Sequence, residues 1–343
     1  MITSIKKQVV IVSPALADAN NGNWQTARRW QKFLQSHTAG GPAFQVRIVT
    51  QWPDGPAAAQ DSCMIALHAR RSAASVRAWA QSRGDGSDMQ PVPGLAVVLT
   101  GTDLYRDIQT DLQAQHSLQL AQRLVVLQDL GLASLPTALQ SRALVIFQST
   151  PARRTLPKSA RVLKAVMVGH LREEKSPQTL FAAARLLVPQ EAIRIDHIGA
   201  PLDAMLAAQA QDTSAACPVY RWLGGLPHEA TRRRIQRAHV LVHTSRMEGG
   251  AHVVMEAVRS GTPVLASRID GNVGMLGADY AGYFDWGNAP QLVALLRRCR
   301  HEPGFLTHLQ AQCAARAPLF SLETERLAVQ QLVTGLTAAQ PRG

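Results

Sequence analysis

The sequence is poor in cysteine and in aromatic residues, and it has no long hydrophobic run. Its four cysteines show neither a CxxC pair nor a spacing typical of metal ligands, which favours reduced thiols in a cytoplasmic protein. Aromatic residues make up only 5% of the chain and are not interleaved with basic ones, which argues against a nucleic-acid partner. The first apolar run, QVVIVSPALA, is too short for a signal peptide or a membrane span and is typical of a strand. We therefore expect no stable association with a membrane.

Two phosphate-binding motifs are also missing. No GxGxxG occurs, which weakens the case for a nicotinamide or flavin dehydrogenase, and no GxxxxGK[ST] occurs, which excludes a P-loop protein. The charge balance nevertheless indicates an anionic partner, because 36 basic residues outnumber 24 acidic ones and the formal net charge is +12.

Short apolar runs alternate with helical patterns along the whole chain. Runs rich in Val, Ile and Leu between helices predict parallel strands that are buried on both faces. Six runs fall in each half: 9–13, 44–50, 64–68, 95–100, 123–128 and 143–148, then 163–169, 193–199, 220–224, 239–245, 263–267 and 281–286. We therefore predict an α/β protein with two Rossmann-like, doubly wound domains facing a cleft, with ligands at the carboxyl ends of the strands.

The predicted domain boundaries follow from composition. Residues 1–150 form the first domain and 161–320 the second, while 151–160 between them carry prolines and basic residues typical of an exposed linker. The segment from about residue 321 to 343 has helical periodicity. This helix either packs back on the first domain or ends the second.

Residues 245–277 carry the clearest functional pattern. Glu248 and Glu256 lie eight positions apart, on either side of Gly249, Gly250 and Ala251. The apolar run that follows predicts a helix with a bare backbone at its N-terminus, which suits a diphosphate. Glu256 would lie about five residues into this helix, ~7–8 Å along its axis. The two carboxylates can thus contact groups on both sides of the diphosphate of a sugar nucleotide. An ordinary capped helix with a solvated Glu256 would explain an isolated EGG, but not the whole pattern.

A turn after the first strand of the second half also carries basic residues. Arg172 and Lys175 precede Ser176-Pro177, which looks like a helix start. They either bind phosphate oxygens or pair with the neighbouring Glu173 and Glu174, and their spacing alone favours neither.

In the first half, Gly22 and Asn23 precede a predicted helix. Asn23 is a credible N-cap, and the helix N-terminus behind it is a second place for an anion. The turns after the third and fourth strands add polar groups that are each weak indicators, since a single strand-end histidine or a surface arginine pair is common. Together they place hydroxyls, a carboxylate and cations where an acceptor would bind: His68, Arg70, Arg71, Thr100, Thr102, Asp103 and Arg106.

The Glu248-to-Glu256 spacing, with EGG and SGTPVLAS, resembles the family 4 glycosyltransferases of GT-B fold. The resemblance implies that Glu248 contacts the donor sugar, that the amides of residues 249–251 hold the diphosphate and that Glu256 binds the ribose. Two positions depart from the family pattern. His170 stands where the family usually has arginine, although Lys175 matches, and the family's HGTD reads TGTD, so Thr100 replaces a histidine. The chain also lacks DxD, so lysine, arginine and helix amides would have to neutralise the diphosphate without a metal ion.

A narrower resemblance covers nearly the whole chain. The stretches PALADANNGNWQTARRW, LHARRSAAS, LTGTDLYRDI and SRMEGGAHVVMEAVRSGTPVLASRIDGNVGMLG resemble the selenosugar synthases of selenoneine biosynthesis. This implies attack by selenophosphate on UDP-N-acetylglucosamine or UDP-glucose, giving a 1-selenosugar, UDP and phosphate. An anionic selenium nucleophile needs no general base. The sugar, the anomeric outcome and the oligomeric state stay open.

The resemblance implies small-molecule substrates as the only partners, with no metal ion and no cofactor beyond the UDP-sugar. It also implies three groups of site residues. They are Lys175, Glu248 and Arg172 for catalysis; His170, Arg246, Gly224, Gly249, Gly250, Ala251, Glu256, Gly271 and Asn272 for the donor; and Gly22, Asn23, Arg71, Thr100, Thr102, Asp103 and Arg106 for the acceptor. The alternatives are a family 4 glycosyltransferase that acts on a lipid or sugar hydroxyl at the membrane surface, and a sugar- or nucleotide-binding protein without catalysis.

Overall fold

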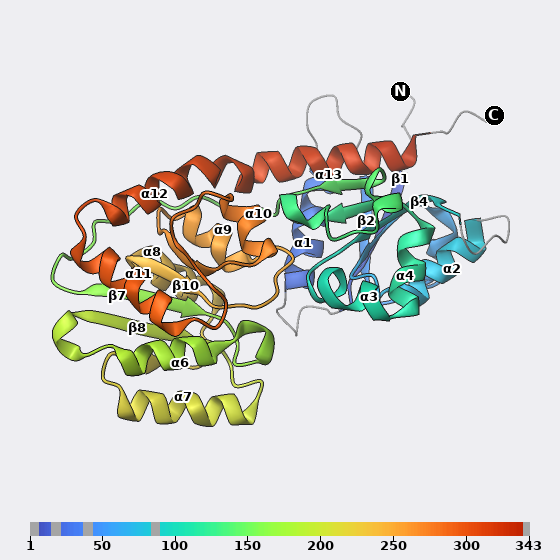
Figure 1. The fold of residues 1–343 in the computed structure, drawn as a ribbon. Helices are drawn as coiled ribbons and strands as arrows, with labels where there is room; N and C mark the ends of the chain where they lie inside the picture. The colour runs from blue at the N-terminus through green and yellow to red at the C-terminus, as the bar shows by residue number, and fades with distance from the viewer. Residues whose placement is uncertain (1–6, 15–21, 37–43, 84–89, 339–343) are drawn as a thin grey trace. The chain divides into compact units, whose positions relative to one another are not determined.

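The chain forms two compact units, each built on its own parallel sheet (Figure 1). A computed structural model describes residues 7–14, 22–36, 44–83 and 90–338. Unit 1 comprises Met1–Gln148 with Leu322–Gly343, and unit 2 comprises Ser149–Ser321. Every one of the predicted apolar runs overlaps a strand, and the six strands in each sheet confirm the predicted fold class of two Rossmann-like α/β domains.

The sheet of unit 1 has the strand order β2-β1-β3-β4-β5-β6, and all its pairs are parallel. Because the order changes direction at β1, the carboxyl ends of β1 and β3 lie next to each other at a switch point, where sheets of this type bind ligands. The strands are β1 (Lys7–Val12), β2 (Phe44–Val49), β3 (Asp61–Leu67), β4 (Val92–Val98), β5 (Ala121–Val126) and β6 (Ala143–Val145). The helices are α1 (Gly22–Gln35), α2 (Ala73–Arg83), α3 (Ile108–Thr110), α4 (Leu112–Leu120), α5 (Thr137–Gln140) and α13 (Leu322–Thr337).

One prediction about α1 is wrong. Gly22 and Asn23 are both already helical, so Asn23 lies inside α1 rather than at its N-cap. The Thr26 hydroxyl donates at 2.8 Å to the carbonyl of Gly22, which lies one turn earlier in the helix. Threonines within helices commonly form this hydrogen bond. The residues just before Gly22 lie outside the described part of the chain.

The C-terminal helix α13 belongs to unit 1 and packs on α1 (Figure 1). Glu325 is fully buried there and accepts three hydrogen bonds from α1. Arg29 approaches both carboxylate oxygens, with Nε at 2.6 Å and Nη2 at 2.9 Å, and the indole of Trp30 donates at 2.6 Å. A forked arginine contact of this kind fixes both position and orientation, so it defines how α13 lies on the unit.

We predict that Glu325→Ala loosens α13. Removing one partner of a buried ion pair leaves Arg29 without its counter-charge and costs about 3–5 kcal/mol. Glu323→Ala is the control on the same helix, because Glu323 is 62% exposed, pairs with Arg326 and contributes about 0–1 kcal/mol. Hydrogen exchange of the α13 amides measures both variants. Equal exchange rates in the two variants would show that the Glu325 contacts do not hold the helix.

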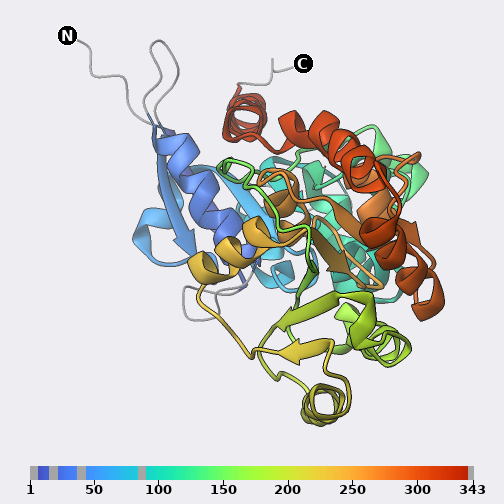
Figure 2. The ribbon, with the colours of Figure 1, turned by 90° about the vertical axis from the view of Figure 1, so that its left-hand side faces the viewer.

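The sheet of unit 2 has the strand order β12-β11-β10-β7-β8-β9, and its pairs are also parallel. Helices α6 and α7 lie beside the β8–β9 end of this sheet (Figures 1 and 2). The strands are β7 (Leu163–Val168), β8 (Ile193–Ile198), β9 (Tyr220–Trp222), β10 (Val240–His243), β11 (Val264–Ser267) and β12 (Tyr283–Phe284). The helices are α6 (Pro177–Leu186), α7 (Ala204–Ala216), α8 (His228–Arg237), α9 (His252–Val258), α10 (Asp270–Leu276), α11 (Ala289–His301) and α12 (Phe305–Arg316).

Residues 151–160, for which the composition predicted a linker, are mostly exposed but group with unit 2. The Pro151 carbonyl accepts from Arg232 Nη2 at 3.0 Å, and the Arg153 amide donates to the Arg259 carbonyl at 2.8 Å. Thr155 packs so closely on Gly261 that a Cβ there would lie 2.0 Å from the threonine hydroxyl oxygen. These backbone contacts bind the segment to one unit. No helix in the described part of the chain is long and apolar enough to cross a membrane.

Candidate functional site

The centre of the candidate site in unit 2 is an ion pair between Lys175 and Glu248. Lys175 ends a short 3-10 turn after β7, and Glu248 lies in the loop between β10 and α9. Lys175 Nζ and Glu248 Oε1 are 2.5 Å apart, and both side chains are largely buried. The stem of Lys175 lies against Gly169, where a Cβ would be in van der Waals contact with it at 3.4 Å. The structure thus brings together two of the three predicted catalytic residues.

Glu248 remains ionised in this partly buried position. Burial alone would raise the pKa of its carboxyl, but the charge of Lys175 and contact with His243 outweigh burial and hold that pKa well below its usual range. His243 is buried at the end of β10, and its Nε2 lies 3.4 Å from Glu248 Oε1. The sequence prediction missed His243, because a histidine at the end of a strand carries no signal without knowledge of what faces it.

The basic residues in the turn before α6 differ in the partners that they contact. Lys175 does not pair with a neighbouring glutamate, whereas Arg172 Nε comes within 4.0 Å of Glu174 and remains half exposed. Arg246, predicted to bind the donor, instead forms an ion pair with Glu173 at 2.8 Å, and its amide donates to the Glu174 carbonyl. Of the two residues for which local pairing was the alternative, Arg172 thus has a neighbouring glutamate as its partner and Lys175 does not.

Glu256 is the fifth residue of α9, as predicted, and is 5% exposed. Two residues of α8 face its carboxylate: His228 Nε2 at 2.7 Å and Arg232 Nε at 3.9 Å. Neither was a predicted site residue. The i,i+4 spacing of His228 and Arg232 puts both on one helix face, which is the only sign of this contact in the sequence.

The glycines around Glu248 allow two loops to approach closely. A Cβ on Gly271, at the start of α10, would lie 2.0 Å from the Glu248 carbonyl oxygen, so only glycine fits there. Gly249 and Ala251 are buried and Gly250 is half-buried in the bend that leads into α9. The Ala251 amide, one of the predicted diphosphate donors, donates to the sulfur of Met275 at 3.2 Å.

The remaining predicted donor residues occupy different environments. Asn272 is fully buried, and its side-chain amide donates to the carbonyl and hydroxyl oxygens of Ser267. These hydrogen bonds hold the start of α10 to the end of β11. His170 is exposed and accepts from the Ala200 amide at 3.0 Å. Gly224 has a left-handed φ of 69° and open space around it.

In unit 1, Asp103 organises the turns that follow β3 and β4. Its carboxylate is fully buried and accepts from the amides of Thr100, Gly101 and Ala69, each at 2.9 Å. Each oxygen of Asp103 thus already accepts from at least one backbone amide, and these bonds fix the two turns relative to each other. The Thr102 hydroxyl is 3.2 Å from His68 Nε2.

A second carboxylate, Asp107, lies next to these turns and was not predicted. Its neighbours include Arg70 and Arg106, whose Nε atoms lie 3.6 Å and 3.2 Å from its oxygens. Arg71 is exposed, and its amide points at His68 Nδ1 at 3.4 Å. Gly22 and Asn23 lie in the first turn of α1. The structure therefore brings Thr100, Thr102, Asp103 and Arg106 together with His68.

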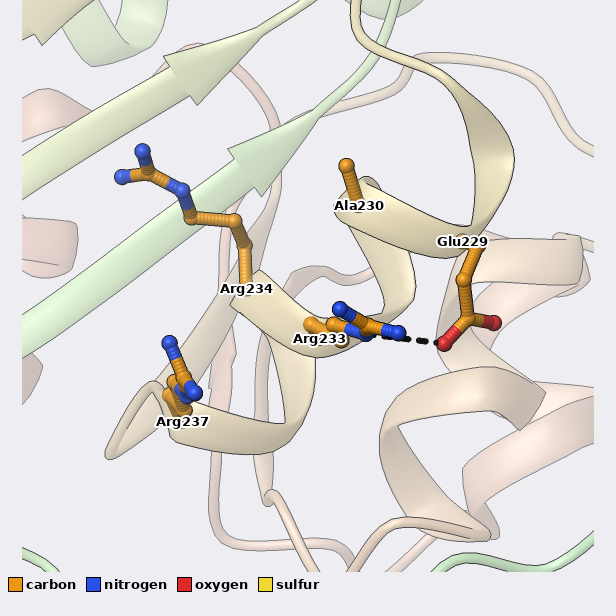
Figure 3. A pocket seen from close by; sticks show the side chains of 5 residues that line it. All are labelled: Glu229, Ala230, Arg233, Arg234 and Arg237. Atoms are coloured by element: carbon orange, nitrogen blue, oxygen red, sulfur yellow. Dashed lines mark hydrogen bonds and ion pairs between the residues drawn. The ribbon is translucent and has the colours of Figure 1, made fainter.

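Unit 2 also carries an arginine-lined surface cavity on α8 (Figure 3). It has a volume of about 380 Å³ and is lined by Glu229, Ala230, Arg233, Arg234 and Arg237. Arg233 pairs with Glu229 at 3.0 Å, and the guanidinium groups of Arg234 and Arg237 point away from that glutamate (Figure 3). None of the predicted site residues lines it.

Comparison with known proteins supports the broader part of the sequence prediction. Residues 148–317 match the family model described as glycosyl transferases group 1, which covers nearly all of unit 2 and just under half of the chain. A search of curated protein sequences finds no match. Together with the structures below, the family match supports a glycosyltransferase of this group.

Solved structures share the fold at low sequence identity. Sucrose-phosphate synthase from Thermosynechococcus elongatus is 17% identical with a TM-score of 0.74, and the match covers 98% of this chain and 100% of that one. HepE from Anabaena, in complex with UDP and glucose, is 14% identical with a TM-score of 0.70, covering 96% and 100%. TarM from S. aureus is 12% identical with a TM-score of 0.62 over 81% of this chain but only 56% of TarM, so this chain spans little more than half of TarM. The predicted GT-B fold is thus confirmed.

We predict that His228 titrates above the usual histidine value of about 6.5. Its hydrogen bond to Glu256 raises its pKa against the effect of burial. The stabilisation from this pair is then complete below pH ~6.5 and is lost as the pH rises through the raised value. NMR titration of the histidine ring carbons measures the pKa, and Glu256→Gln should return it towards 6.5. An unchanged pKa in that variant would contradict the assignment of the contact.

Proposed function

We propose that this protein transfers a sugar from a UDP-sugar, UDP-N-acetylglucosamine or UDP-glucose, to selenophosphate. The products are a 1-selenosugar, UDP and phosphate. The observation that carries the donor half is a pair of glutamates in unit 2 with basic partners, the partly buried Glu248 with Lys175 and the buried Glu256 with His228. The acceptor half rests on the sequence resemblance and on the polar cluster of unit 1.

The donor half assigns one role to each carboxylate. Glu248 orients the sugar, and Glu256, at the fifth position of α9, binds the ribose. UDP in the HepE and TarM structures, which share this fold, supports a uridine diphosphate donor. Residues 249–251 would supply amides to the diphosphate, and the Ala251 amide would exchange the weak acceptor Met275 for a phosphate oxygen.

Lys175 places a positive charge next to the leaving group. When the bond between the anomeric carbon and the diphosphate oxygen breaks, the electron pair and a negative charge move onto UDP. A lysine held in a partly buried site stabilises that charge more than it would in water. The Thr244 hydroxyl donates to the Lys175 carbonyl at 2.7 Å, and this hydrogen bond holds the lysine turn next to the end of β10.

The overall step balances without a base. Selenium attacks the anomeric carbon as an anion, the carbon–selenium bond forms and UDP departs. Water then cleaves the selenium–phosphorus bond, with hydroxyl going to phosphorus and the proton to selenium. General-base catalysis, which contributes ~10²–10⁴-fold for hydroxyl acceptors, is not required for this nucleophile.

We predict that Lys175→Ala slows UDP release about 10²–10³-fold, because it removes a preorganised charge from the departing diphosphate. The assay mixes the protein with a UDP-sugar and selenophosphate, without added metal, and follows UDP and the selenosugar by mass spectrometry. Lys164→Ala is the matched control, since Lys164 is an exposed lysine on β7 of the same unit.

Two results would decide against these assignments. Normal turnover in Lys175→Ala would remove the lysine from the leaving-group step. If wild-type protein gave no UDP with selenophosphate but transferred sugar to a lipid or sugar hydroxyl, the acceptor assignment would fall. That result would favour a glycosyltransferase working at a membrane surface, for which the arginines of α8 offer a basic face for docking on anionic lipid (Figure 3).

A further inference from the structure

Asp107 in unit 1 has a carboxylate oxygen that is buried and has no hydrogen-bond donor among the described residues. The side chain is 3% exposed, and Oδ2 is the unsatisfied atom. A buried charged acceptor without a donor is unfavourable, so it persists in folded proteins mainly where a ligand or water completes it. None of the roles proposed above uses Asp107.

Cations face this carboxylate from two elements. Arg70, in the turn after β3, places Nε 3.6 Å from Oδ2, which is too far for a hydrogen bond. Arg106, from the short π-helical turn Asp103–Asp107, contacts Oδ1 at 3.2 Å. Both arginine side chains are about half exposed, at 47% and 48%, so their guanidinium groups can turn towards an anion that arrives from solvent.

His68 closes the other side of the cluster in a strained conformation. It has a left-handed φ of 73°, which is uncommon for a residue with a side chain, and it is 3% exposed. Its Nε2 lies 3.9 Å from Asp107 Oδ2 and 3.2 Å from the Thr102 hydroxyl. Burial lowers the pKa of His68 against the pull of Asp103 and Asp107, so the ring stays neutral at pH 7. The strain is maintained because Asp103 fixes the adjoining amides.

A carboxylate beneath two arginines distinguishes between anions. Arginines attract any tetrahedral oxyanion, whereas the carboxylate repels one whose oxygens are all ionised. An oxyanion that keeps one proton can donate its O–H to the unsatisfied oxygen while the arginines bind its other oxygens. Hydrogen phosphate has such a proton at pH 7.5, and sulfate, of equal charge and similar size, has none.

We propose that Asp107, with Arg70, Arg106 and Thr102, forms a binding site for a tetrahedral oxyanion that carries a proton. Hydrogen phosphate and its selenium analogue both belong to this class. The inference deepens the proposed function, and rests on it, in assigning this site to the acceptor. It names the group that would select a phosphate-type acceptor over other anions.

The test is calorimetric titration of the full chain with inorganic phosphate and with sulfate at pH 7.5 and equal ionic strength. Wild-type protein should bind phosphate at least ~10²-fold more tightly, since sites built to pair with a donor reject analogues that lack it by up to ~10⁵-fold. Asp107→Asn should lose most of this ratio. Asp111→Asn is the control, because it removes a nearby charge while asparagine still caps α4.

Arg70→Ala provides a second variant whose change lies on an exposed side chain, so that folding is not at issue. It should weaken both anions by a similar factor and leave the ratio unchanged. Equal binding of the two anions by wild-type protein, no binding of either, or an unchanged ratio in folded Asp107→Asn would each overturn the proposal.

The selenophosphate assay on the same proteins separates the two hypotheses. Discrimination of phosphate from sulfate without any selenosugar would leave the site intact and refute the proposed function. Selenosugar formation that is as fast in Asp107→Asn as in wild type, with no discrimination in either, would refute the site alone.

Discussion

The ionised carboxylate of Glu248 is the constraint around which the loops of unit 2 are arranged. A charge in a partly buried position needs compensation, and Lys175 and His243 provide it from two different strand ends. The backbone of the lysine turn is in turn tied to the segment after β10 through Thr244 and Arg246. Gly271 then allows α10 to approach the Glu248 carbonyl. Three loops that lie far apart in the sequence are thus positioned around one partly buried charge.

Four other buried carboxylates show how partners distinguish structural from functional roles. Glu325 and Asp103 each accept several donors and hold elements of unit 1 together. Glu256 has a cation on either side, one of them exposed. Asp107 alone among these four has an oxygen that is fully buried and has no donor among the described residues. An unsatisfied buried oxygen, rather than burial of the side chain itself, therefore identifies the carboxylate with capacity left for a ligand.

Much of the fold could be predicted from the sequence, and less of the site. Val/Ile/Leu runs such as 9–13 and 239–245 locate strands, because burial on both faces leaves a continuous apolar signal. The Glu248–Glu256 spacing correctly placed Glu256 within a helix, since that depends on local periodicity alone. The partners of these two glutamates depend on tertiary contacts, since His243 ends β10 and His228 begins α8, and the contacts of Asp107 in unit 1 likewise depend on the fold. No local pattern distinguishes them from other polar residues. An N-cap at Asn23 predicts a helix from residue 24, whereas Gly22 is already helical, and differences of this size are usual at helix ends.

Under the proposed function, His243 also explains how Lys175 can leave its partner. A diphosphate arriving in unit 2 competes with Glu248 for the lysine, and a carboxylate that lost its only cation would become an uncompensated buried charge. With His243 at 3.4 Å, Glu248 keeps a second neighbour that can donate to it while the lysine moves to the phosphate. Unit 1 repeats the principle with Arg70 and Arg106, which rest on Asp107 until an anion arrives. There no described residue donates a hydrogen bond to Asp107 Oδ2, so this oxygen is left for a proton on the ligand itself. Under the two proposals, the same electrostatic requirement makes one site accept a fully ionised diphosphate and the other a protonated oxyanion.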